Sequence, residues 1–151
     1  MPSALIRANL YPGNMQKIDG ITINSDLTAL QDLHSFCEHL KPKIALDDQV
    51  HANMLLALSE AATNAIVHGN HNDPGKKVSV EFFSQSDQIV VKVSDEGQGF
   101  DPSSLPDPLS EENLLKQGGR GVFLIEQFAD NVEFQDEGST ILLTFNKNSA
   151  G

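Results

Sequence analysis

Two stretches in the first half of the chain carry apolar residues at helical spacing. The first predicts a helix that Asn24 or Ser25 caps and that ends at Lys41-Pro42, because the residue before a proline avoids helical geometry. Its apolar positions are Leu27, Leu30, Leu33, Phe36, Cys37 and Leu40. The second predicts a longer helix from near Asp47 to His68-Gly69, since glycine commonly ends helices. Its apolar positions are Val50, Met54, Leu58, Ala61, Ala62 and Ala65.

Apolar and polar residues alternate in the second half of the chain, as they do in half-buried strands. Lys77–Phe83 and Gln88–Ser94 are separated by the polar turn Ser84–Asp87, which predicts an antiparallel hairpin. Asn131–Gln135 and Ser139–Phe145 predict a second hairpin near the end of the chain.

Four other segments complete the predicted arrangement. Ser3–Leu10 fits a short first strand, with a turn at Tyr11–Asn14. Pro102–Gln117 contains prolines and acidic residues without a period, which predicts a long mobile loop, and a helix from Gly121 to about Ala129 follows it. We expect the tail, Asn146–Gly151, to be frayed. Helices, then strands, then a helix between strands predict a two-layer α+β sandwich.

Length and charge narrow the classes of function. With 151 residues the chain fits a single domain over residues 1–151. The formal net charge of −11 argues against nucleic-acid binding, and it agrees with a basic protein partner or simply with an acidic, solvated surface. No apolar stretch approaches the ~20 residues of a membrane span and no signal peptide is recognisable. The single cysteine, Cys37, fits a cytoplasmic location.

The long predicted helix carries the first candidate site, in the stretch EAATNAIVHGN. Glu60, Asn64 and His68 are four residues apart, so they lie along one face of the helix. Glu60 can accept a proton from a hydroxyl group or water, and the side-chain oxygen of Asn64 is a suitable ligand for Mg²⁺. An exposed polar helix face without a function would show the same spacing.

The second candidate site is DEGQGFD, directly after a predicted strand. The carboxylate of Asp95 accepts hydrogen bonds, so it would prefer the amino group of adenine to the carbonyl of guanine. Gly97 and Gly99 would let a base lie against the backbone, where any Cβ would collide. A glycine-bearing turn is the alternative, and a calcium loop fits poorly because glycines stand where oxygen ligands are needed.

The third candidate site is GGRGVFLI (Gly118–Ile125), which opens directly into the helix predicted from Gly121. Free N–H groups at the start of a helix attract anions, and Arg120 would add positive charge against phosphate oxygens. A flexible loop joining its helix is the alternative.

Two further stretches of the sequence suggest a known binding motif but do not match it. Residues 69–77 imitate a phosphate-binding P-loop, but the spacing is one residue too long and the Ser or Thr is missing. The histidines and Cys37 do not form a zinc motif.

In this order the three segments resemble the ATP-binding fold shared by gyrase, the histidine kinases and a heat-shock chaperone family (the GHKL, or Bergerat, superfamily). The resemblance covers about residues 25–146. It implies a mixed, mostly antiparallel sheet covered by helices on one face, with an ATP lid at 102–117. Within the superfamily the chain is similar to the bacterial anti-sigma factor serine kinases, since SEAATNAIVHG (residues 59–69) is close to their first motif.

The anti-sigma factor serine kinases bind a sigma factor and phosphorylate a serine of a small anti-anti-sigma (STAS-type) protein. The resemblance therefore implies both partners, ATP and Mg²⁺, with Glu60 as general base on the substrate serine and Asn64 as Mg²⁺ ligand. It implies an adenine site at Asp95, Gly97 and Gly99. The other nucleotide contacts that it implies are Asn64, His68, Gly119, Arg120, Gly121 and Val122.

Two other functions stay open, as does a homodimer. One is a non-catalytic module that binds ATP and sequesters a regulatory partner, although such a module would not need Glu60. The other is an isolated ATPase domain of a histidine kinase. Phe123 opposes it, because histidine kinases usually have a third glycine there.

Overall fold

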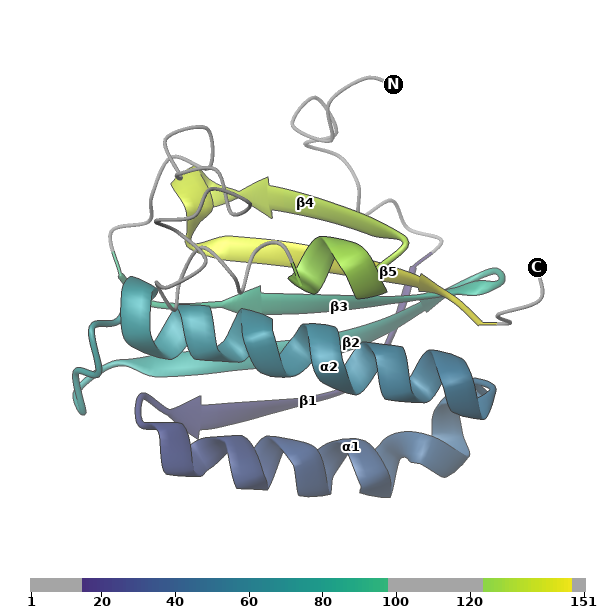
Figure 1. Cartoon of the computed structure of the whole chain (residues 1–151), viewed down its shortest axis with the longest axis horizontal. Helices are drawn as coiled ribbons and strands as arrows, with labels where there is room; N and C mark the ends of the chain where they lie inside the picture. The colour runs from purple at the N-terminus through teal and green to yellow at the C-terminus, as the bar shows by residue number, and fades with distance from the viewer. Residues whose placement is uncertain (1–14, 98–123, 148–151) are drawn as a thin grey trace.

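The protein is built on a five-stranded sheet with the strand order β1-β2-β3-β5-β4 (Figure 1). The computed structural model describes residues 15–97 and 124–147. All four pairings between neighbouring strands are antiparallel. The strands are β1 (Gln16–Asn24), β2 (Lys77–Gln85), β3 (Gln88–Ser94), β4 (Asn131–Gln135) and β5 (Thr140–Asn146).

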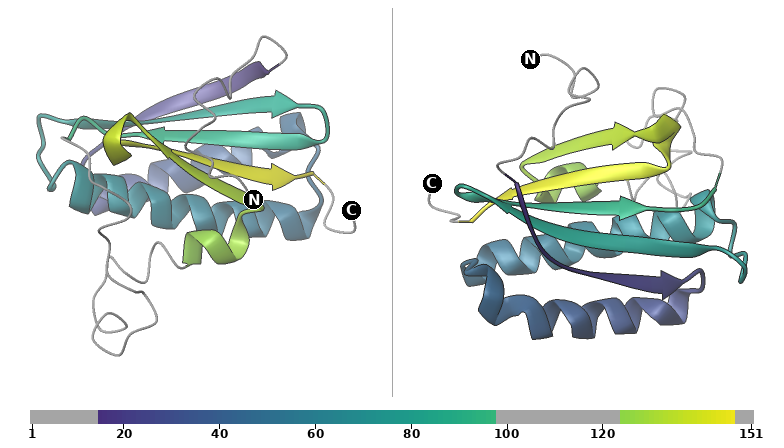
Figure 2. Two further views of the ribbon diagram at one scale, coloured as in Figure 1. Left: turned by 90° about the horizontal axis from the view of Figure 1, so that it is seen from above. Right: turned by 180° about the vertical axis from the view of Figure 1, so that it is seen from behind.

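Two long helices cover one face of this sheet (Figures 1 and 2). Helix α1 (Leu30–Ile44) follows a short 3-10 turn, η2 (Leu27–Ala29), and packs over β1 and β2. Helix α2 (Asp48–Asn64) runs antiparallel to α1 beside β3 and β5, and continues as a π-helical turn, η3 (Ala65–Gly69). The predicted two-layer α+β sandwich is therefore confirmed.

The core lies between the two layers, because the strands turn alternate side chains toward the helices. From β2, β3 and β5 the fully buried contributors include Phe82, Val91 and Leu143, and Met54 of α2 lies against the same cluster. The ring centroids of Phe36 in α1 and Phe82 in β2 are 5.7 Å apart. Residues 124–128 are helical and lie on the same side of the sheet as α2 (Figure 2).

The hairpins that alternation predicts are confirmed. Strands β2 and β3 are joined by a tight turn in which Ser86 has a positive φ of 50°. Strands β4 and β5 are joined through a 3-10 turn, η5 (Asp136–Gly138), whose Gly138 has a φ of 94°. The long helix begins as predicted, with Asp47 as its N-cap.

Three predictions about the ends of elements are wrong, and strand β1 was not predicted at all. Helix α1 is preceded by a cap at Asp26, not at Asn24 or Ser25, and it runs through Pro42 to Ile44. Asn146 is not frayed, since it pairs with Gln88 at the end of β5.

Other predictions fall outside the described residues. They are the strand at Ser3–Leu10, its following turn, the lid at 102–117 and the first residues of the helix from Gly121. Within the described part of the chain, no helix is both long and apolar enough to cross a membrane.

Candidate functional site

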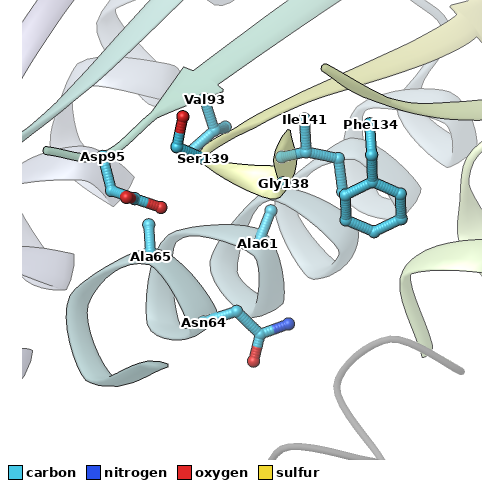
Figure 3. A pocket seen from close by; sticks show the side chains of 9 residues that line it. All are labelled: Ala61, Asn64, Ala65, Val93, Asp95, Phe134, Gly138, Ser139 and Ile141. Carbon is cyan, nitrogen blue, oxygen red and sulfur yellow. The ribbon is translucent and has the colours of Figure 1, made fainter. Parts of the chain in front are cut away.

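The end of α2 meets the end of β3 on the helix-covered side of the sheet (Figure 3). Ala61, Asn64 and Ala65 approach from the helix, and Val93 and Asp95 come from β3 and the residue after it. The start of β5 and the turn before it close the third side of a small pocket. Two of the three candidate segments are therefore brought together, although they are about thirty residues apart in the sequence.

Glu60 and Asn64 stand one turn apart on α2, as their spacing predicts. Both are half-buried, whereas His68 at the end of the row is exposed. Figure 3 shows the Asn64 side chain pointing away from the apolar residues that line the pocket. Asn64 thus lines the pocket, Glu60 stands one turn before it on α2, and both side chains are partly exposed.

At its C-terminal end α2 continues as the π-helical turn η3, which is wider than a turn of α-helix. The N–H of Asn70 donates to the carbonyl of Ala65 at 2.8 Å, and the N–H of Asn72 donates to that of Ile66 at 2.8 Å. Such π-turns are rare and concentrate at functional sites. Here the widened turn presses Gly69 against the carboxylate of Asp95, so closely that a Cβ at position 69 would collide with it.

Gly97 is required by the same close approach. A Cβ at position 97 would lie far inside 3.0 Å of the carbonyl oxygen of Gly69. The sequence suggested that glycine at this position leaves room for a base. The structure adds a different physical reason, which is that the chain after β3 packs directly on the backbone at the end of η3.

Asp95 is held in place by its own backbone and by its neighbour. Its N–H donates to the carbonyl of Ser139 at 2.9 Å, and its Oδ1 accepts from the N–H of Gly97 at 2.8 Å. The side chain is half-buried, and this burial raises the pKa of the Asp95 carboxyl above 3.8, against the opposing effects of the Gly97 N–H, Lys76 and His71. Among residues 15–97 and 124–147, no hydrogen-bond donor to Oδ2 is found.

Asn70 is a site residue that sequence reasoning missed. Its side chain is buried, with an exposed fraction of 1%. Its Nδ2 donates to Ser25 Oγ at 2.8 Å and to the Lys77 carbonyl at 2.9 Å, and its Oδ1 accepts from the N–H of Glu96 at 2.8 Å. A single asparagine after a helical glycine looks like an ordinary turn residue, so no local signal points to this network.

The second and third candidate segments are described only in part. Gly99, Gly119, Arg120, Gly121 and Val122 lie outside the described residues, so their predicted phosphate and adenine contacts stay predictions. From the helix that follows, Ile125 is buried in the core with an exposed fraction of 1%.

The oxygen atoms beside the pocket fit Mg²⁺ better than a metal that needs a protein cage. Among residues 15–97 and 124–147 no group of three His, Cys, Asp or Glu side chains could hold a metal ion. Mg²⁺ is usually held by one or two protein oxygens together with water and phosphate oxygens. The accessible amide oxygen of Asn64 meets that requirement.

A family model with the description "histidine kinase-like ATPase domain" matches residues 23–145. The chain belongs to this family. The antiparallel sheet and its helical layer agree with this family, and the junction of α2 and β3 lies within the residues that the model matches.

Several relatives have more specific names. The chain is 38% identical over 92 residues to a protein of Oceanobacillus iheyensis named anti-sigma F factor, an alignment that covers 58% of this chain and 63% of the relative. It is 35% identical over 105 residues to a Bacillus subtilis protein named serine-protein kinase RsbW, covering 61% and 62%. The alignments thus span a little under two thirds of the length of these relatives.

A solved structure shows the same fold. It contains the RsbU and RsbW domains of a Mycobacterium tuberculosis protein and matches with a TM-score of 0.60 and 16% sequence identity. The match covers 85% of this chain and 31% of that one. At this identity the comparison supports the fold and not the activity.

Proposed function

We propose that the protein is an ATP-dependent serine protein kinase that acts as an anti-sigma factor. The observation that carries the proposal is the junction described above, where Asn64 of α2 and the half-buried Asp95 line one pocket and Glu60 stands one helical turn before Asn64. Membership of an ATPase family and the similarity to proteins named anti-sigma F factor and serine-protein kinase RsbW support it.

Asp95 would select the base of the nucleotide. Its Oδ1 already accepts from Gly97, so its Oδ2 would accept a hydrogen bond from the amino group of adenine. Guanine has a carbonyl at that position and would face the carboxylate with a second acceptor. Gly99 would contact the base, residues 119–121 would contact the phosphates, and His68 and Val122 would make other contacts to the nucleotide, as the family resemblance implies.

Asn64 would hold Mg²⁺ through its amide oxygen, together with phosphate oxygens and water. The bound ion would neutralise negative charge that develops on the transferring phosphoryl group.

Glu60 would act on the serine of the protein substrate. Its carboxylate would take the proton of the serine hydroxyl, and the hydroxyl oxygen would form a bond to the γ-phosphorus of ATP. The bond between this phosphorus and the bridging oxygen breaks, and ADP leaves with the bonding electrons. The products are phosphoserine and ADP, and the proton on Glu60 passes to water.

The substrate would be an anti-anti-sigma protein of the STAS type, and the second partner a sigma factor. The kinase would withhold the sigma factor from RNA polymerase until the unphosphorylated substrate displaces it. Phosphorylation of that substrate would restore the inhibition.

Glu60→Gln tests this proposal, because the change keeps the shape of the side chain and removes the base. We expect ATP binding to persist while phosphoryl transfer from labelled ATP to a candidate STAS protein falls about 10²–10⁴-fold. The matched control is Glu38→Gln, which alters an exposed carboxylate on α1. Transfer at the wild-type rate by Glu60→Gln would exclude Glu60 as the base. If the wild-type protein binds a partner tightly but transfers no phosphate to any candidate, a sequestering module explains the protein better.

A further inference from the structure

We propose that Asn70 is a positioning residue that fixes the Asp95–Gly97 segment and thereby sets the preference of the site for adenine over guanine. The proposal rests on the function proposed above. It concerns a residue that does not touch the nucleotide in that proposal, since its side chain is buried and fully engaged with the protein.

The backbone after β3 is fixed by three consecutive N–H groups. That of Asp95 donates to Ser139 at the start of β5, and that of Gly97 donates back to the carboxylate of Asp95. The middle one, from Glu96, donates to Oδ1 of Asn70 at 2.8 Å. Asn70 therefore ties the backbone of this segment to the end of η3, in addition to the bond that the Lys77 N–H donates to the Glu96 side chain at 2.7 Å.

Asn70 is itself held rigidly. Both of its Nδ2 hydrogens are used, one by Ser25 just after β1 and the other by the Lys77 carbonyl at the start of β2. The hydroxyl group of Ser25 donates in turn to the Lys76 carbonyl. One side chain thus joins the ends of three neighbouring strands, β1, β2 and β3, at the edge of the pocket.

This rigidity matters for selectivity because a single hydrogen bond discriminates between bases only when its acceptor is held in place. If the Asp95–Gly97 segment could rotate, another of its groups could pair with the guanine carbonyl at little cost in binding free energy. An acceptor that is fixed and half-buried leaves the guanine carbonyl unpaired against a carboxylate. A displacement of the order of 1 Å is enough to remove such a preference.

The experiment compares the affinities for ATP, GTP and inorganic tripolyphosphate by titration calorimetry with Mg²⁺, below the melting temperature of each variant. For Asn70→Ala we expect ATP affinity to fall about tenfold, with little change for GTP and tripolyphosphate. Ser25→Ala removes only one partner of Asn70, so we expect a smaller loss of about twofold to threefold in the same direction. A merely structural role would not change the ratio of ATP to GTP affinity.

His51→Ala is the matched control. His51 is also a buried polar residue and lies near the N-terminal end of α2, where its Nε2 is 3.4 Å from the carbonyl oxygen of Cys37. It stands at the other end of the helix, so its loss should lower the melting temperature and leave the ATP to GTP ratio unchanged.

The outcomes separate this inference from the proposed function. If the wild-type protein prefers ATP and Asn70→Ala keeps the same preference, the positioning role is wrong and the kinase proposal stands. If the wild-type protein binds neither nucleotide, or both equally, the adenine site and the role of Asn70 are both overturned. Should Asn70→Ala fail to fold, Ser25→Ala decides, because an unchanged ratio in that variant contradicts the proposal.

Discussion

The two ends of α2 are built in opposite ways. At the N-terminal end Asp47 caps the helix, and its Oδ1 accepts from the N–H of Val50 at 2.9 Å. This is a regular N-cap, in which the cap residue has an extended backbone and its side chain accepts from an N–H of the first turn. At the C-terminal end the helix widens into η3, a glycine is pressed against a carboxylate, and burial raises the pKa of Asp95.

The N-terminal end of α2 therefore stabilises the fold, whereas the C-terminal end forms part of the candidate site. A capped helix start lowers the free energy of the folded state without other requirements. A half-buried carboxylate does the reverse, because it loses hydration that a ligand only later replaces. Changes at the first end should therefore affect stability alone, whereas changes at the second should affect ligand binding at least as much.

The largest effect is expected at Gly97. Gly97→Ala would drive a Cβ into the carbonyl of Gly69, and backbone cannot yield as a flexible side chain does. We expect the free energy of unfolding to fall by about 3 kcal/mol and ATP affinity to be lost, as measured by denaturant unfolding and calorimetry. Gly75→Ala is the control, since its Cβ would lie 3.3 Å from Asp73 Oδ1 at an exposed turn. Equal behaviour of the two variants would contradict the close packing of η3 on the chain after β3.

A smaller effect is expected at the other end of the helix. Asp47→Ala removes the N-cap and should lower the free energy of unfolding by about 1 kcal/mol. ATP affinity, measured well below the melting temperature, should stay at the wild-type value. Asp47→Asn retains an acceptor and should recover most of the stability. A parallel loss of ATP affinity in Asp47→Ala would mean that the two ends of α2 are coupled.

The smallest stability effect, and one of opposite sign, is expected at Asp95. The pKa of this carboxyl is raised on folding, so the wild-type protein loses stability as the pH rises from 3.8 through the folded pKa. Asp95→Asn does not titrate, and the carboxyl is only half-buried, so at pH 7 we expect a melting temperature about 1–3 °C above wild type. This difference should shrink as the pH is lowered toward 4. ATP affinity should nevertheless fall about tenfold or more. A variant that is less stable at pH 7 would contradict the cost assigned to this carboxylate.

The sequence predicts those elements whose pattern is local. The hairpin of β2 and β3 and the start of α2 at Asp47 need only alternation, a polar turn and a capping residue. Strand β1 escapes the same reasoning because Ile18 is out of phase with Ile21 and Ile23, and the bulge between Lys17 and Asp19 restores the phase only in three dimensions.

Helix α1 and the site show two other limits of local reasoning. Pro42 sits near the end of α1, where its missing N–H costs a single hydrogen bond, while continuing the helix buries Ile44. At the site, Glu60, Asn64 and Asp95 were found because their residue types suggest chemistry. Asn70 was missed, because its partner Glu96 is 26 residues away and no sequence pattern joins them.

The pairing of β3 with β5 has a consequence for how this domain can change over evolutionary time. Ser94 and Thr140 face each other across the sheet, 46 positions apart along the chain. The entropy of closing so long a connection grows only with the logarithm of its length, so ten inserted residues would cost roughly 0.2 kcal/mol. Outside β4, η5 and the helical residues 124–128, selection can therefore change the length of this connection at little entropic cost, while the sheet that it connects stays the same.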